Sequence, residues 1–406
     1  MKRLFLVTAM LLTFAYGTMA QNRAIIFEET KVWEEVVSKA KKENKFIFVD
    51  CYTDWCGPCK ILVSQVFSLD RVADFFNERF VNAKFEMEKD ADGVAHKGTW
   101  DVNAYPTLLF IDPATGKVMH RLVGAGQPDW LIEGANVATD PNRNLASLIE
   151  RYNAGERSPE FVLPYLKALG SGLMRSQQNK VAEEYLKGKT LDEMATPEHW
   201  ELIRVNIFDP FSGAIRTVTA NPGKFYNIEG VGQQAIDQHL TALFMATATS
   251  FTSPKIPFDK ARYDEVLAYY KTIHIPAVQP ALFYMKTVGK AHDGDWAGVL
   301  ADLLEVEANT DILGMGNVSR YESAFIPMLG KSGDKAIIDK AIGIVDAKLD
   351  GIKTIYSKPN YLNMKSDLYL AAGNNAAADE AKKQAEVFQQ QIQEEIARNN
   401  ARLPAR

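Results

Sequence analysis

The chain has 406 residues, of which 47% are hydrophobic and 24% are charged, and its formal net charge is −5. This composition is ordinary for globular proteins, and the length allows two or three domains. The mild acidity, without any block of Lys or Arg, excludes the basic surface that nucleic-acid-binding proteins need. We therefore expect no nucleic acid among the partners of this protein.

The first twenty residues form a pattern of their own. Lys2 and Arg3 give a positive start, an apolar run follows from Leu4 to Tyr16, and small residues end it at Ala20. This order predicts a cleaved signal peptide over residues 1–20, because the apolar run is short for a membrane span, which needs ~20 residues. An uncleaved anchor is the alternative. No later stretch is long and apolar enough to span a membrane, so we expect a mature protein in a periplasm or outside the cell.

Helix and strand patterns alternate in the next part of the chain. Continuous apolar runs and a turn-linked hairpin predict strands over residues 46–49, 80–87, 107–111 and 117–123. Amphipathic spacing and cap residues predict helices over residues 30–43, from the cysteines to Val66, from the cap residues Ser68 and Asp70 to Phe76, over 91–100 and over 129–137. This order predicts an α/β domain with helices that cover a central sheet.

No convincing strand pattern remains from residue 144 onward, where helical patterns are separated by Gly, Pro, Asn and Asp. We therefore predict an α/β domain over 21–140 and an all-helical domain over 144–406. Three similar turns, which begin at Gly294, Gly333 and Gly373, follow one another about 40 residues apart. Such a period is typical of stacked helical hairpins, so the C-terminal domain is predicted to be repeat-like.

The chain has three cysteines, too few for a scaffold held together by disulfides. Cys56 and Cys59 form a Cys-x-x-Cys motif where a predicted strand passes into a predicted helix. A thiolate is the form that attacks a disulfide, and the unpaired N–H groups at a helix start stabilise it. Cys56 is therefore the expected nucleophile. Cys59, one helical turn later, is expected to resolve the mixed disulfide.

Half of a zinc site is the other interpretation of a Cys-x-x-Cys motif. Such a site needs two further ligands, but the six histidines form no His-x₃₋₅-His pair and Cys51 is the only other thiol. We expect neither a metal nor another cofactor. Cys51 lies on the predicted strand, out of phase with Asp50, and is expected to be buried as a small apolar residue.

Three segments resemble the thioredoxin superfamily. The run from Trp55 to Lys60, Trp-Cys-Gly-Pro-Cys-Lys, resembles the active-site segment of that superfamily. Tyr105-Pro106-Thr107 resembles its cis-proline loop, in a form also seen in protein disulfide isomerases, and Gly124 matches the glycine that follows the hairpin. The resemblance covers residues 25–137 and implies a thioredoxin-like fold there.

The resemblance also implies roles for five residues beyond the two cysteines. Asp50 matches a buried aspartate that takes the proton of the resolving Cys59, and Lys84 matches the lysine that pairs with this aspartate. Trp55 would pack beside the disulfide. Pro106 would form a cis peptide bond, and the backbone of Tyr105 would pair with an extended substrate strand.

The resemblance implies a thiol–disulfide oxidoreductase, which the signal peptide would export. Gly57-Pro58 between the cysteines resembles reducing thioredoxins, which favours reduction or isomerisation of protein disulfides. The expected partners are client proteins with disulfides and a redox partner protein.

The C-terminal part resembles a second family at one point. Tyr369, Gly373, Ala378 and Ala385 have spacings similar to a tetratricopeptide repeat hairpin, although Lys382 stands where that family prefers an aromatic residue. The alternative function follows from this part of the chain. The protein would then be a binding or adaptor protein whose main module is helical and whose thioredoxin-like domain is redox-sensitive.

Overall fold

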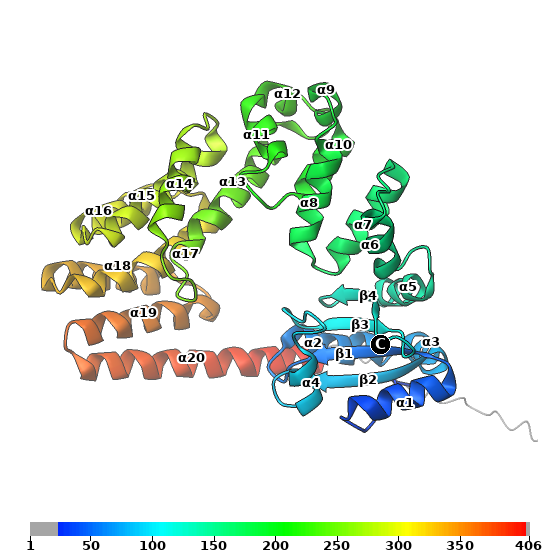
Figure 1. Cartoon of the computed structure of the whole chain (residues 1–406). Coiled ribbons are helices and arrows are strands. Elements are labelled where there is room, and N and C mark those ends of the chain that lie inside the picture. The colour runs from blue at the N-terminus through cyan, green and yellow to red at the C-terminus, as the bar shows by residue number, and fades with distance from the viewer. Residues whose placement is uncertain (1–22, 403–406) are drawn as a thin grey trace, which may run out of the picture. The chain divides into compact units, whose positions relative to one another are not determined.

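The computed structural model describes residues 23–402 (Figure 1). The predicted signal peptide over residues 1–20 lies outside the described residues. Contacts divide the chain into two compact units, Met1–Val181 and Ala182–Arg406. The fold class is the predicted one, a mixed α/β thioredoxin-like domain followed by a mostly helical chain.

The first unit is built on a four-stranded sheet in the order β2-β1-β3-β4. The strands are β1 (Phe46–Tyr52), β2 (Phe80–Glu86), β3 (Thr107–Ile111) and β4 (Val118–Val123). β1 pairs with β2 in parallel and with β3 in antiparallel orientation, and β3 pairs with β4 in antiparallel orientation. Because β1 is central, its carboxyl end lies between two other strands, and the chain leaves the sheet there toward the cysteines.

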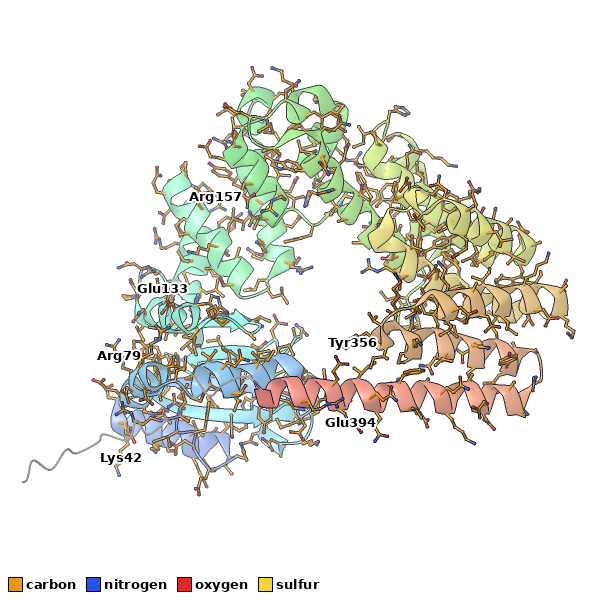
Figure 2. All side chains as sticks on the ribbon, turned by 180° about the vertical axis from the view of Figure 1, so that it is seen from behind. Lys42, Arg79, Glu133, Arg157, Tyr356 and Glu394 are labelled. Carbon is orange, nitrogen blue, oxygen red and sulfur yellow. A yellow bond between two sulfur atoms is a disulfide. The ribbon has the colours of Figure 1, made fainter. Side chains whose placement is uncertain are left out.

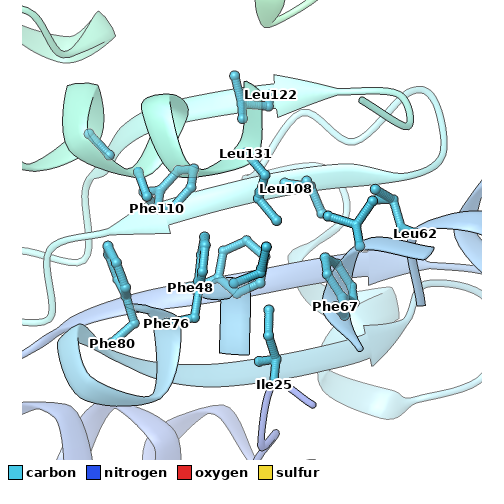
Figure 3. Packing of buried hydrophobic residues seen from close by; sticks show 14 residues of the cluster. Ile25, Phe48, Leu62, Phe67, Phe76, Phe80, Leu108, Phe110, Leu122 and Leu131 are labelled. Carbon is cyan, nitrogen blue, oxygen red and sulfur yellow. The ribbon is translucent and has the colours of Figure 1, made fainter. Parts of the chain in front are cut away.

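Two hydrophobic layers cover the faces of this sheet. Helices on one face are α2 (Gly57–Leu62), the π-helical η1 (Val63–Phe67), α3 (Asp70–Arg79) and α5 (Pro128–Thr139). Their side chains pack on Phe48, Phe110 and Leu122 (Figure 3). On the other face, Trp33 of α1 (Trp33–Glu43) packs with Trp100 and with the second cluster of buried residues. The short α4 (Ala91–His96) lies beside β2.

The alternation of side chains along β1 determines on which face of the sheet each side chain packs. Phe48 belongs to the cluster under α3 and α5, whereas Ile47, Val49 and Cys51 belong to the cluster under α1. Cys51 is fully buried, as predicted, and burial raises the pKa of its thiol well above the ordinary value. Cys51 therefore serves the core as a small apolar residue.

Two further helices, α6 (Leu145–Asn153) and α7 (Pro159–Ser171), contact β4 and belong to the first compact unit. The backbone N–H of Leu145 donates to Nδ1 of His120 on β4 at 3.3 Å. Burial lowers the pKa of His120 to about 4, so the ring is neutral and can accept this bond. The compact unit thus continues past residue 140, and the domain boundary at 140–144 stays a prediction.

The rest of the described chain is helical, and no strand follows β4 up to residue 402. Its α-helices are α8 (Arg175–Leu186), α9 (Leu191–Met194), α10 (Pro197–Asn206), α11 (Gly213–Ala220), α12 (Pro222–Tyr226), α13 (Gly232–Ser250), α14 (Lys260–Lys271), α15 (Gln279–His292), α16 (Trp296–Ala308), α17 (Met315–Phe325), α18 (Lys335–Gly351), α19 (Lys358–Ala371) and α20 (Asn375–Arg402). None of the helices in the described part is long and apolar enough to cross a membrane. Charged residues such as Glu394 of α20 lie at the surface of this part (Figure 2).

The three predicted Gly turns share a local geometry. Gly294, Gly333 and Gly373 have φ values of 75°, 65° and 75°, a region that favours glycine. The Asp or Asn after each glycine accepts backbone N–H groups of the next helix as its cap. Gly294 and Gly373 join α-helices that pack on each other, but Gly333 follows a 3₁₀ segment. Helical hairpins are therefore present, while the 40-residue repeat stays a prediction.

Candidate active site

Cys56 and Cys59 form a disulfide where β1 passes into α2, with their Cα atoms 5.3 Å apart. The backbone N–H of Cys56 donates to the carbonyl oxygen of Thr53 at 3.1 Å, which closes a turn between strand and helix. Cys56 is then the N-cap of α2, and its Sγ accepts the backbone N–H of Cys59 at 3.1 Å. Sγ of Cys56 therefore accepts one of the N–H groups that have no partner within the helix, as stabilisation of a thiolate requires.

Little of either cysteine is accessible in the oxidised form. The exposed fractions are 2% for Cys56 and 4% for Cys59, so burial does not distinguish the two residues. The expected difference between them lies in the helix geometry, because Cys56 caps the helix and Cys59 is inside its first turn. The helix start stabilises negative charge at Cys56 after reduction.

Trp55 and the cis-proline loop lie together beside the disulfide. Trp55 is 66% exposed, its Nε1 donates to Oε2 of Glu88 at 2.9 Å, and its ring meets the ring of Tyr105 edge-on at 5.8 Å. The Tyr105–Pro106 peptide bond is cis. The carbonyl oxygen of Pro106 accepts the N–H of Gly124, but no partner is found among residues 23–402 for the backbone N–H or C=O of Tyr105. These groups are available to an extended peptide.

Asp50 lies on β1 beneath this region and is 3% exposed. Burial raises the pKa of its carboxyl to about 7, and the charges of Lys84 and Lys31 oppose that rise. Its Oδ1 is buried and has no hydrogen-bond partner in the described part of the chain. A carboxyl group with this pKa can exchange a proton near neutral pH, which suits the role that the resemblance assigns to it.

Lys84 lies opposite Asp50 in the register of β1 and β2, but the two side chains form no ion pair within the described residues. The side chain of Lys84 is exposed at the edge strand, with Nζ 5.5 Å from the ring centre of Phe27. A second cation, Lys31, contacts the same strand, where its Nζ donates to the carbonyl oxygen of Lys84 at 2.6 Å. The attraction between Lys84 and Asp50 therefore acts at a distance, and the paired role of Lys84 stays a prediction.

Sequence reasoning missed Lys31, Glu86 and Glu88. Lys31 precedes a helix and carries no motif. Glu86 and Glu88 alternate with apolar residues at the end of β2, a pattern that normally indicates a solvent-facing side. Glu86 is nevertheless 3% exposed. Only the neighbouring turn, which is distant in sequence, shows why a carboxyl group is buried there.

Comparison with known proteins places these features in a family. The thioredoxin family model matches residues 24–136. Thioredoxin-T of Drosophila melanogaster is 35% identical over 82 residues, which cover 20% of this chain and 47% of that protein. Thioredoxin H-type of Picea mariana is 31% identical over 130 residues, and the match covers 32% of this chain and 97% of that thioredoxin. The chain belongs to the thioredoxin family.

A solved structure is similar over the same part of the chain. It is the solution structure of a candidate disulphide-isomerase from Bacteroides thetaiotaomicron, 45% identical, which matches 30% of this chain and 98% of its own with a TM-score of 0.28. The thioredoxin-family match ends at residue 136, so the helical remainder lies outside it. The predicted thioredoxin-like fold is confirmed, and the Cys56–Cys59 pair in this fold supports thiol–disulfide oxidoreductase chemistry.

Proposed function

We propose that this protein is an exported thiol–disulfide oxidoreductase that reduces or isomerises disulfides in client proteins. The observation that carries the proposal is the Cys56–Cys59 disulfide at the start of α2, where Sγ of Cys56 accepts a backbone N–H. This arrangement stabilises one thiolate and keeps the second thiol within reach of the first. Family membership supports the same chemistry.

The reduction transfers two electrons from the dithiol to the client. The Cys56 thiolate attacks one sulfur of the client disulfide, forms a mixed disulfide and releases the other sulfur as a thiolate. Cys59 loses its proton to Asp50 and attacks Sγ of Cys56. The second client thiol leaves, and the Cys56–Cys59 disulfide forms. A redox partner protein must then reduce this disulfide before the next turnover.

Isomerisation uses the first step without net electron transfer. The client thiolate that the first attack releases can attack another disulfide of the same client and free a different client thiolate. That thiolate then attacks the client sulfur of the mixed disulfide, forms a new client disulfide and expels Cys56 in its reduced form. The cis-proline loop supports both reactions, because the free backbone groups of Tyr105 can hold an extended client segment beside Cys56.

The reduction potential of the Cys56–Cys59 pair tests the direction of the reaction. We expect a value near roughly −270 mV, as in thioredoxin, from equilibration of the protein with glutathione buffers. A value near roughly −120 mV would contradict a reductase and indicate an oxidase. Failure to turn over a client disulfide in the presence of excess reductant would favour the adaptor interpretation, in which the helical part is the main module.

Export is the second part of the proposal, and it rests on the sequence pattern of residues 1–20. In a bacterial host that secretes proteins, the mature chain should begin at Gln21. N-terminal sequencing of the protein from the periplasmic fraction checks this expectation. An intact N-terminus in the cytoplasmic fraction would contradict export.

A further inference from the structure

A buried carboxylate lies under the turn that leads to Cys56. Glu86 is the last residue of β2 and is 3% exposed. Its Oε1 accepts the backbone N–H of Asp54 at 3.2 Å, and its Oε2 accepts the backbone N–H of Glu88 at 2.8 Å. Both oxygens thus satisfy backbone N–H groups, one in the Thr53–Cys56 turn and one in the segment after β2.

The turn that Glu86 supports determines the position of Cys56. The carbonyl oxygen of Thr53 accepts the N–H of Cys56 at 3.1 Å, so the N–H of Asp54 lies inside the turn and needs an acceptor from elsewhere. The segment after β2 holds the same turn at two more points, because Glu88 accepts the indole N–H of Trp55 and Lys89 pairs with Asp54. Those two contacts are exposed, whereas the contact of Glu86 is part-buried and the Glu86 side chain itself is buried.

The backbone of Glu86 is itself held in place. Its N–H donates to Oδ2 of Asp90 at 2.8 Å, and its carbonyl oxygen accepts the N–H of Asp90 at 3.0 Å. A Cβ atom on Gly93 would lie 2.8 Å from that carbonyl oxygen, so the glycine permits a close approach of α4 to the end of β2. Glu86 is therefore anchored to the sheet on one side and bonded to the turn on the other.

We propose that Glu86 is a positioning residue that keeps Cys56 at the N-cap of α2 and thereby sustains its reactivity. This inference rests on the proposed function. Loss of the carboxylate leaves the part-buried N–H of Asp54 without an acceptor, which is costly unless the turn moves toward water. A shifted turn carries Cys56 away from the N–H of Cys59, and the thiolate of Cys56 loses that stabilisation.

Two variants separate positioning from a simple effect of charge. Glu86→Gln removes the negative charge and replaces one acceptor oxygen by a donor, so one N–H loses its bond. Glu86→Asp keeps the charge, but its shorter side chain cannot reach both N–H groups. A charge effect alone would lower the pKa of Cys56 in Glu86→Gln and would leave the pKa of Cys56 unchanged in Glu86→Asp. A positioning role predicts a higher pKa of Cys56 in both variants.

The measurement is the pH profile of iodoacetamide alkylation of Cys56 in the reduced full-length protein. We expect the alkylation rate at pH 7 to fall about two- to fivefold in both variants, with the midpoint of the profile at higher pH. Glu34→Gln, on the exposed side of α1, is the charge-matched control and should leave the profile unchanged. Circular dichroism must show that each variant is folded.

An unchanged or faster alkylation rate in Glu86→Asp would overturn the positioning role. If neither variant folds, Glu86→Gln is combined with Asp54→Pro, which removes the orphaned N–H, and recovery of folding with near wild-type alkylation supports the proposal. Recovery of folding with slow alkylation overturns it. The assay needs no client, so it stays separate from the proposed function, which wild-type protein tests by reduction of a client disulfide.

Discussion

Cys56→Ser should reduce the rate of client disulfide reduction to the uncatalysed level, whereas Cys59→Ser should accumulate mixed disulfides with the client. The reason is the geometry at the start of α2, where Sγ of Cys56 accepts a backbone N–H and Cys59 lies one turn later. Removing the nucleophile prevents the first step. Removing the resolving thiol prevents only the second, so the covalent intermediate persists.

Non-reducing electrophoresis and mass spectrometry of each variant after incubation with a disulfide-containing client measure this difference. Cys51→Ser is the matched control. Because Cys51 is fully buried on the other face of the sheet, it should take no part in mixed disulfides, and its replacement should leave client reduction as in the wild type. Faster alkylation of Cys59 than of Cys56 in the reduced protein would reverse the two roles. Mixed disulfides in Cys56→Ser at the level of Cys59→Ser would do the same.

Asp50→Asn should make the protein more stable at pH 8, by up to roughly 4 kcal/mol, and should have little effect at pH 4. The folded pKa of Asp50, about 7, lies above the ordinary value of 3.8, because burial disfavours the charge. Between these pH values the folded state holds a proton that the unfolded state has lost. The free energy of unfolding of the wild-type protein therefore falls as the pH rises from about 4 to about 7. In the Asn variant this residue does not titrate, so its contribution to stability does not fall.

Urea unfolding at pH 4 and pH 8 measures this effect in the two proteins. Asp74→Asn is a suitable control, since Asp74 is exposed on α3 and its removal should change stability similarly at both pH values. A stability difference between wild type and Asp50→Asn that is the same at pH 4 and pH 8 would show that Asp50 does not titrate in this range in the folded protein.

The same variant tests the proton-transfer role of Asp50. If Asp50 takes the proton of Cys59, Asp50→Asn should slow the release of the mixed disulfide about 10²-fold or more and leave its formation nearly unchanged. In the wild type, the release rate should rise with pH through about 7, as Asp50 ionises. Stopped-flow measurement of both steps checks this, and equal slowing of the two steps would remove Asp50 from the reaction.

The fold of the first domain could be predicted because its signals are local. Three apolar runs and a turn-linked hairpin partner correspond to the four strands, and amphipathic spacing located α1, α3 and α5. Neighbouring residues indicate the change from strand to helix around Cys56 and Cys59, since Gly57 and Pro58 begin α2 directly after the turn. The resemblance to thioredoxins added the cis bond before Pro106, which spacing alone does not indicate.

Other features depend on residues that are far apart in the sequence. Lys84 matched a family position, yet at the edge strand its side chain reaches solvent rather than the carboxyl group of Asp50. Lys31 approaches the same strand from a segment 53 residues earlier. Helices α6 and α7 cover β4, and the N–H of Leu145 donates to His120 there, a contact that no periodicity predicts.

The sequence by itself therefore determined the order of the elements, the cysteine pair at a strand-to-helix junction and the helical character after residue 144. Each of these follows from hydrophobic periodicity or from neighbouring residues. The tertiary structure alone decided that Glu86 is buried. In an alternating strand an acidic residue indicates the solvent side. The turn that packs over Glu86 supplies the N–H of Asp54, which with the N–H of Glu88 satisfies both oxygens of the buried carboxylate.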